Sequence, residues 1–159
     1  MKILGVDPGL NITGYAVVEK TNKGLKILEA GFIQTSSKEK LQKRLDKIHR
    51  SLLEIIRTFK PEALALEKLY AHYRHPVTAS LLGHARGVIS LLAAEEKIPL
   101  FEYASTRVKK SITGKGHASK DQIQRMIAHI LGIKAQIKQD TADALAIALT
   151  HINILEREL

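Results

Sequence analysis

The sequence predicts an α/β domain with a five-stranded mixed sheet flanked by helices. Two features support this class. Three apolar, strand-like segments open the chain and are separated only by short turns, and from residue 41 onward helical and strand periodicities alternate. At 159 residues the chain is long enough to bury a substantial core, so we expect one domain over residues 1–159.

The first three strands are predicted at residues 2–7, 14–20 and 25–35, with the turns "PGLNIT" and "TNKG" between them. Connections of this length join antiparallel neighbours, because a parallel neighbour needs a much longer crossover. The amino-terminal part of the sheet is therefore expected to be antiparallel.

Helices and strands are expected to alternate in the rest of the chain. An amphipathic helix that Pro61 ends is predicted from apolar residues spaced by three and four: Leu41, Leu45, Ile48, Leu52, Ile55 and Phe59. Strands follow at "EALALE" and "LFEY", and a Leu- and Ala-rich helix over 77–96 separates them. The remainder is predicted to be helical, with a basic interruption at "TGKGHASK" and with Ser105 as a helix cap.

Composition narrows the possible chemistry. The chain has no cysteine, which excludes disulfides, thiolate metal sites and a thiol nucleophile. No apolar run approaches a membrane span, and the first residues lack the features of a secretory signal, so we expect a cytoplasmic protein with no membrane association. The net charge of +9 suggests a polyanionic partner such as nucleic acid, although a well-solvated surface would also account for it.

Two acidic residues end predicted strands whose same-face neighbours are small. Asp7 shares its face with Gly5, and Glu67 shares its face with Ala63 and Ala65. Small residues would allow a helix to pack close to the sheet beside these acids. Taken alone, Asp7 before Pro-Gly is also typical of a turn.

A third acidic segment is "KQDTADALAIALTHI". Asp140 and Asp143 lie three residues apart and share a helical face, in a helix made slender by alanine. Helix capping and the helix dipole would also explain these two acids. If they converge with Asp7 and Glu67, the four carboxylates would repel one another without cations. Oxygen ligands suit Mg²⁺, with Mn²⁺ as a substitute, and two such ions can hydrolyse a phosphodiester.

Five sequence blocks resemble the RuvC family of Holliday junction resolvases. They are "GVDPG…TGYAVV", "ALEKLY", "HARGVI", "FEYASTRVKKSITGKGHASK" and "QDTADALAIALTH", and they occur in the family's order from about residue 2 to 152. The resemblance implies a ribonuclease-H-like fold, a homodimer, and Mg²⁺-dependent paired, symmetric nicks in two strands of like polarity of a four-way DNA junction during recombination and repair. It also implies cooperation with the branch-migration helicase complex of RuvA and RuvB.

By motif position, the resemblance assigns catalysis and metal binding to Asp7, Glu67, Asp140 and Asp143. Some relatives carry histidine where this chain has Asp140. Lys109 and Lys120 match family lysines near the active site. A different nuclease or transposase-like enzyme of the same fold, and a junction-binding protein without catalysis, are the rival interpretations.

Two segments are expected to contact DNA. Tyr70 and Arg74 lie in "EKLYAHYRHP", where Tyr70 or Tyr73 could stack on an unpaired base or pack on the next helix. The second segment, "STRVKKSITGKGHASK", is either a solvated face or a phosphate-binding surface. Its candidate DNA-binding residues are Arg107, Lys109, Lys110, Lys115 and Lys120.

The long helix carries Gly83 and Gly87 four residues apart, so another helix could approach it closely. That helix could belong to the same chain or to a second subunit, and the sequence leaves the choice open.

Overall fold

The computed structural model describes residues 1–69 and 76–158, with no side-chain account of Glu158. Five strands form one sheet in the order β3-β2-β1-β4-β5. Along the chain the elements are β1 Lys2–Asp7, β2 Ile12–Thr21, β3 Gly24–Gln34, α1 Leu41–Phe59, β4 Ala63–Glu67, α2 Pro76–Glu95, β5 Leu100–Tyr103, α3 Ser105–Thr113, α4 Lys120–Leu131 and α5 Gln139–Glu158. The predicted mixed sheet and its helices are confirmed.

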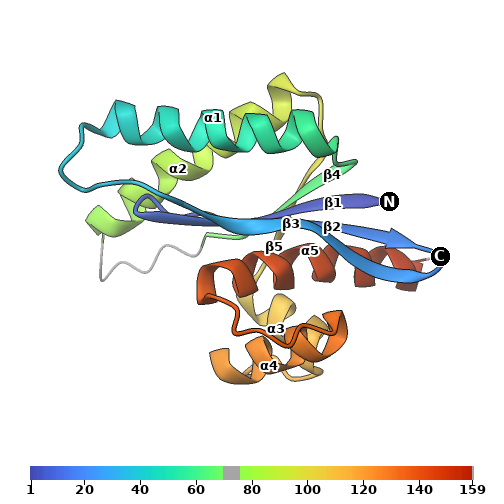
Figure 1. Cartoon of the computed structure of the whole chain (residues 1–159). Helices are drawn as coiled ribbons and strands as arrows, with labels where there is room; N and C mark the ends of the chain where they lie inside the picture. The colour runs from blue at the N-terminus through green and yellow to red at the C-terminus, as the bar shows by residue number, and fades with distance from the viewer. Residues whose placement is uncertain (70–75, 159) are drawn as a thin grey trace.

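The strand directions follow from the connections. β1, β2 and β3 are antiparallel neighbours, whereas β4 runs parallel to β1 and β5 runs parallel to β4. Because β1 and β4 are adjacent and parallel, their carboxyl ends meet at one edge of the sheet, at the left of Figure 1. Asp7 and Glu67 are the last residues of these two strands.

Helices cover both faces of the sheet. In Figure 1, α1 and α2 lie on one face, and α5 lies on the other with α3 and α4 beyond it. Leu4, Val6 and Leu64 point to the α1–α2 side, where they pack with Ile48 and Ile89. The second core packs against α5 on the opposite face, and its sheet residues include Ile3, Ala16, Val18, Ala63 and Ala65.

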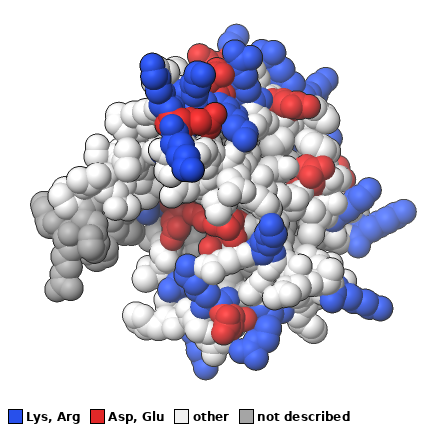
Figure 2. Space-filling view, turned by 60° about the vertical axis from the view of Figure 1, so that its left-hand side comes forward, with Lys and Arg blue, Asp and Glu red and all other residues white. Residues whose placement is uncertain are grey.

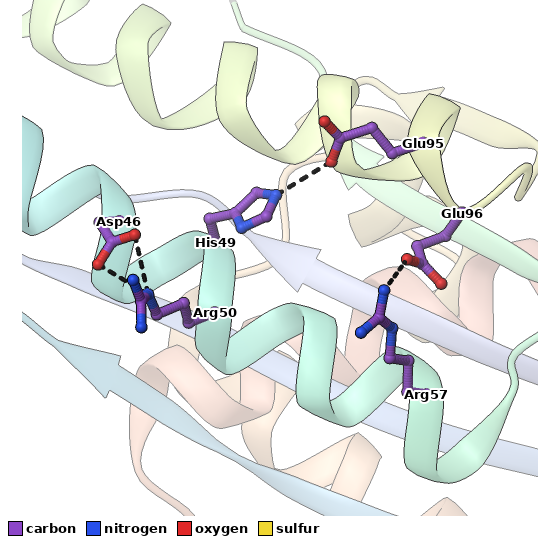
Figure 3. Close-up of polar contacts among 6 residues, drawn as sticks. All are labelled: Asp46, His49, Arg50, Arg57, Glu95 and Glu96. Carbon is purple, nitrogen blue, oxygen red and sulfur yellow. Dashed lines mark hydrogen bonds and ion pairs between the residues drawn. The ribbon is translucent and has the colours of Figure 1, made fainter.

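Polar contacts join α1 to the end of α2 (Figure 3). His49 lies 3.1 Å from Glu95, and Arg57 donates to Glu96 over 3.1 Å. α1 ends where predicted, because Lys60 takes a left-handed conformation, its N–H donates to the Ile56 carbonyl over 2.8 Å, and Pro61 follows.

Two local predictions are wrong. The turn after β1 is shorter than "PGLNIT", because pairing of Ile12 with Gln34 starts β2 two residues earlier. Ser105 does not cap α3: the helix begins at Ser105, and the N-cap residue is Ala104. The capping box that forms is in α4, where the Ser119 hydroxyl accepts from the Gln122 N–H and the Gln122 side chain accepts from the Ser119 N–H.

By length and apolar composition, α2 is the one helix in the described part of the chain that could cross a membrane. Four of its residues, Ala85, Ile89, Leu92 and Ala93, are buried within the protein. A core helix of a soluble protein satisfies the same criteria, so this finding is weak evidence for a span.

Candidate active site

The site depends on how closely α5 approaches the sheet. A Cβ added to Gly5 would lie 2.3 Å from the carbonyl oxygen of Ala144, and a Cβ added to Gly14 would lie 2.0 Å from that of Asp140. Both distances are shorter than any van der Waals contact, so only glycine permits this packing. Gly14 is also the cross-strand partner of Asp7. The predicted close contact between small sheet residues and the Ala-rich helix is therefore confirmed, and it brings the start of α5 to the end of β1.

A pocket of about 660 Å³ opens at this edge of the sheet. Asp7 and Glu67 line it, together with Lys68, Arg86 and Thr106. Figure 2 shows acidic side chains grouped near the centre of this face, with Lys and Arg side chains around them.

Asp7 has an unusual electrostatic environment. Burial and the neighbouring charges of Asp143, Glu67 and Asp140 raise the pKa of Asp7 to about 7, while Lys120 acts in the opposite direction. Burial also raises the pKa of Asp143, against the opposing effect of Lys120 and a hydrogen bond from Gln139, and Glu67 and Asp140 raise it further. The four predicted acids thus lie close enough to repel one another. Repulsion of this kind is not expected of an Asp7 that serves only as a turn residue.

The donor set fits a hard divalent cation. All four side chains offer carboxylate oxygens, the ligands that Mg²⁺ and Mn²⁺ prefer. Within residues 1–69 and 76–158, no three Asp, Glu or His side chains stand close enough together to hold a metal ion as they are. Burial and the charges of the neighbouring acids raise the pKa of Asp7 and of Asp143, and a bound cation would lower the energy of their ionised forms.

The predicted DNA-binding cations are spread over α3, α4 and the loop between them. Lys120 is the first residue of α4 and is within electrostatic reach of Asp7 and Asp143. Lys109 on α3 is partly buried, and Lys115 is exposed in the loop. The N–H of Gly114 donates to the Lys110 carbonyl over 2.9 Å. Gly114 therefore caps the carboxyl end of α3, and its N–H is engaged within the helix.

Arg107 and Lys110 line a second pocket of about 510 Å³ with Arg157 from the last turn of α5. Thr106 borders both this pocket and the acidic one. The contribution of Arg157 was missed, because nothing in the sequence places the end of α5 beside α3. Tyr70 and Arg74, and with them Tyr73, lie outside the described residues.

Fold and site together define a ribonuclease-H-like α/β domain with an acidic centre at the carboxyl edge of its sheet. Residues 3–151 match the family model described as crossover junction endodeoxyribonuclease RuvC. A RuvC of Ehrlichia chaffeensis is 40% identical, over 95% of this chain and 96% of its own length. A RuvC of Rhodopirellula baltica is 46% identical, over 92% of this chain and 83% of its own length.

Among solved structures, Thermus thermophilus RuvC in complex with a Holliday junction substrate superposes with a TM-score of 0.92 at 35% identity, covering 99% of this chain and 96% of the other. The chain belongs to the RuvC family of crossover junction endodeoxyribonucleases, which are metal-dependent nucleases. The predicted family, fold and enzyme class are confirmed.

Proposed function

We propose that this nuclease resolves four-way DNA junctions in recombination and repair by hydrolysing one phosphodiester in each of two strands of like polarity. The observation that carries the catalytic part is that burial, together with the charges of Asp143, Glu67 and Asp140, raises the pKa of Asp7 to about 7. A protein that only bound DNA would gain nothing from clustered carboxylates facing a phosphate.

Asp7, Glu67, Asp140 and Asp143 would hold Mg²⁺, with Mn²⁺ as a substitute and two ions per site. Bound there, the cations supply a nucleophilic water and neutralise the charge that develops on the leaving oxygen. Asp7 and Glu67 present their carboxylates from the sheet, while Asp140 and Asp143 present theirs from α5. Lys120 offsets part of the negative charge of the acids and can pair with a phosphate.

The basic residues would hold the DNA backbone around this centre. Arg107 and Lys110 share a pocket with Arg157, and this pocket adjoins the acidic one at Thr106. A strand whose scissile phosphate lay at the acids could therefore place a neighbouring phosphate among these three cations. Lys109 and Lys115 extend the basic surface. Tyr70 and Arg74, predicted from the sequence segment "EKLYAHYRHP", would add further DNA contacts.

We further propose that the active unit is a homodimer that pairs through α2. Two cuts require two sites, and each chain carries one set of acids. The residues of α2 that are large, apolar and exposed are Val77, Leu81 and Leu91. Apart from their chain neighbours and the nearby main chain of α2, no described atom lies within 4 Å of a Cβ built on Gly83 or Gly87, so these glycines do not serve packing within the described chain. A second copy of α2 would cover this face, with the glycines permitting a close approach.

Cooperation with RuvA and RuvB, which the family resemblance implies, completes the proposal. A cytoplasmic location is proposed from the sequence, which has no long apolar run and no features of a secretory signal at its first residues.

The test compares Asp7→Asn, Glu67→Gln, Asp140→Asn and Asp143→Asn with the native protein on labelled four-way junction, linear duplex and RNA–DNA hybrid. In Mg²⁺ we expect nicking of the junction to collapse in these variants, with residual activity tolerated in Asp140→Asn. In EDTA, junction affinity should hold or increase, because each variant removes a negative charge that faces a phosphate.

Asp46→Asn is the matched control, since Asp46 pairs with Arg50 on the exposed surface of α1. Normal nicking by Asp7→Asn would refute the catalytic assignment. Cutting of the hybrid instead of the junction would indicate a different nuclease of the same fold.

A further inference from the structure

Arg86 of α2 makes two contacts at the acidic edge of the sheet. One guanidinium nitrogen, Nη1, donates to the main-chain carbonyl of Glu67, and the other, Nη2, pairs with the carboxylate of Glu102 on β5. The Arg86 side chain is only 13% exposed and borders the same pocket as Asp7 and Glu67. Sequence analysis assigned it no role, although it lies within the block "HARGVI".

These two contacts lie at the carboxyl end of β4 and on the neighbouring strand β5. The N–H of Lys68 donates to the Tyr103 carbonyl over 2.7 Å, which is the last main-chain bond from this end of β4 to β5. The Glu67 carbonyl, one residue earlier, accepts from Arg86. A planar guanidinium with both arms engaged fixes its acceptors in direction as well as distance. Arg86 therefore clamps the ends of β4 and β5 to α2.

The positive charge of Arg86 is paired with Glu102 and not with the four acids of the proposed site. Glu102 neutralises it locally, whereas the cation that lowers the pKa of Asp7 and Asp143 is Lys120. The contribution of Arg86 to the acids is thus geometric: it holds the main chain that carries the Glu67 carboxylate.

We propose that Arg86 is a positioning residue that orients Glu67 toward Asp7 and thereby sets the affinity of the acidic site for a divalent cation. This inference rests on the proposed metal-binding role of the four acids. Groups that orient a metal ligand typically change metal affinity or activity by about 10–100-fold when they are lost.

The experiment measures Mn²⁺ binding to the DNA-free protein by electron paramagnetic resonance. Arg86→Met should weaken Mn²⁺ binding by about 10–100-fold. Arg86→Lys should fall between Arg86→Met and the native protein, because an ammonium cannot span both acceptors in the same geometry. Glu102→Gln, which keeps an acceptor for Nη2, should cause a smaller loss in the same direction.

Arg57→Met is the matched control, because Arg57 also joins a helix to a glutamate, Glu96, but lies away from the acids. It should leave Mn²⁺ binding unchanged. Circular dichroism and urea unfolding check that each variant is folded; if Arg86→Met does not fold, the comparison is carried by Arg86→Lys and Glu102→Gln.

Junction affinity in EDTA separates positioning from direct contact with DNA. A positioning residue leaves this affinity within about twofold of the native value, whereas loss of a phosphate contact would lower it and reduce the salt slope by ~0.9. Loss of junction affinity with normal Mn²⁺ binding would overturn the inference, as would Mn²⁺ binding equal to that of Arg57→Met. Glu67→Gln is the reference: if it too binds Mn²⁺ normally, the proposed metal site itself fails.

Discussion

The place of Asp7 at the end of β1 follows from the local sequence, whereas its raised pKa depends on residues that are distant in the chain. It ends a buried strand, and three other carboxylates raise its pKa together with burial. Ionisation of Asp7 therefore destabilises the folded, metal-free protein, and a bound cation would offset this destabilisation. The same repulsion that destabilises the metal-free fold would favour binding of a divalent cation in the proposed site.

We expect the stability of the metal-free protein to fall as pH rises from about 4 to about 7. The pKa of Asp7 is raised from 3.8 in the unfolded chain to about 7, so in this range the folded state holds a proton that the unfolded state has lost. Urea unfolding in EDTA at several pH values measures the effect. Asp7→Asn should unfold at increasingly higher urea concentration than the native protein as pH rises. A difference that stayed constant with pH would contradict the raised pKa.

Cation binding should show the opposite dependence on pH. Because the ligand is the ionised carboxylate, Mg²⁺ must displace the proton that Asp7 holds below pH 7. Calorimetric titration with Mg²⁺ at pH 6 and pH 8 should therefore give tighter binding at the higher pH, with proton release at the lower one. Equal affinity at both values would indicate that Asp7 is not a ligand.

At the scale of elements, α5 reaches the sheet only because glycine and alanine face one another there. Gly14 lies against the main chain of Asp140, so the helix that carries two acids is set by a glycine on β2. α2 differs from α5, since Gly83 and Gly87 face away from the described chain, and the neighbouring Arg86 reaches the end of β4.

Gly14→Ala should impair nicking and destabilise the protein by about 1–3 kcal/mol, because the new methyl group has to displace the main chain of Asp140. Thermal unfolding and nicking rate, measured on the same preparations, test this. Asp46→Asn, on the exposed surface of α1, is the control, and its stability and nicking should stay close to those of the native protein. Native behaviour of Gly14→Ala would show that α5 can shift without consequence.

Leu91→Glu should separate the subunits if α2 forms the dimer contact. Leu91 is 56% exposed in the single chain, so the substitution costs little within one subunit but buries a charge in the paired one. Sedimentation should show a monomer with a native circular dichroism spectrum, and junctions should be nicked singly instead of in pairs. Glu95→Gln, a change of charge at the end of the same helix, should remain dimeric. A dimeric Leu91→Glu protein would exclude α2 as the contact.

For the whole molecule, the distribution of charge matters more than its total. The chain carries a net +9, yet the acids gather at one edge of the sheet and the basic residues lie around them. In the proposed function, this arrangement would let DNA bind by its backbone while one phosphate approached the acidic site.

Junction binding should weaken with salt, and the slope should report each phosphate contact. Lys110→Ala and Arg157→Ala should each flatten the log–log slope by ~0.9 on duplex arms, because both line the pocket beside the acidic site. Arg50→Ala, on the far α1 surface, should leave the slope unchanged. Fluorescence anisotropy over a range of salt concentrations gives the slopes. Native slopes for both Lys110→Ala and Arg157→Ala would mean that this pocket is only a solvated surface.

The sequence by itself determined the elements and the order of the acids along the chain. The spacing of Leu41 to Phe59 defined α1 to the residue, and strand alternation placed Asp7 and Glu67 beside small neighbours. These features are local, because periodicity within one segment decides which face is buried. The family, and the four acids proposed to be catalytic, followed from these features and from the order of the five blocks.

Only the tertiary structure decided the features that join distant segments. The Arg86 clamp needs residues 67, 86 and 102 to meet, and the second pocket needs α3 beside the end of α5. The choice of Ser119 over Ser105 as a cap depended on where each helix begins after packing. The orientation of Gly83 and Gly87 was likewise decided by the side of α2 that packs on the sheet. An apolar helix with small residues on several sides has no single face that its sequence marks as buried.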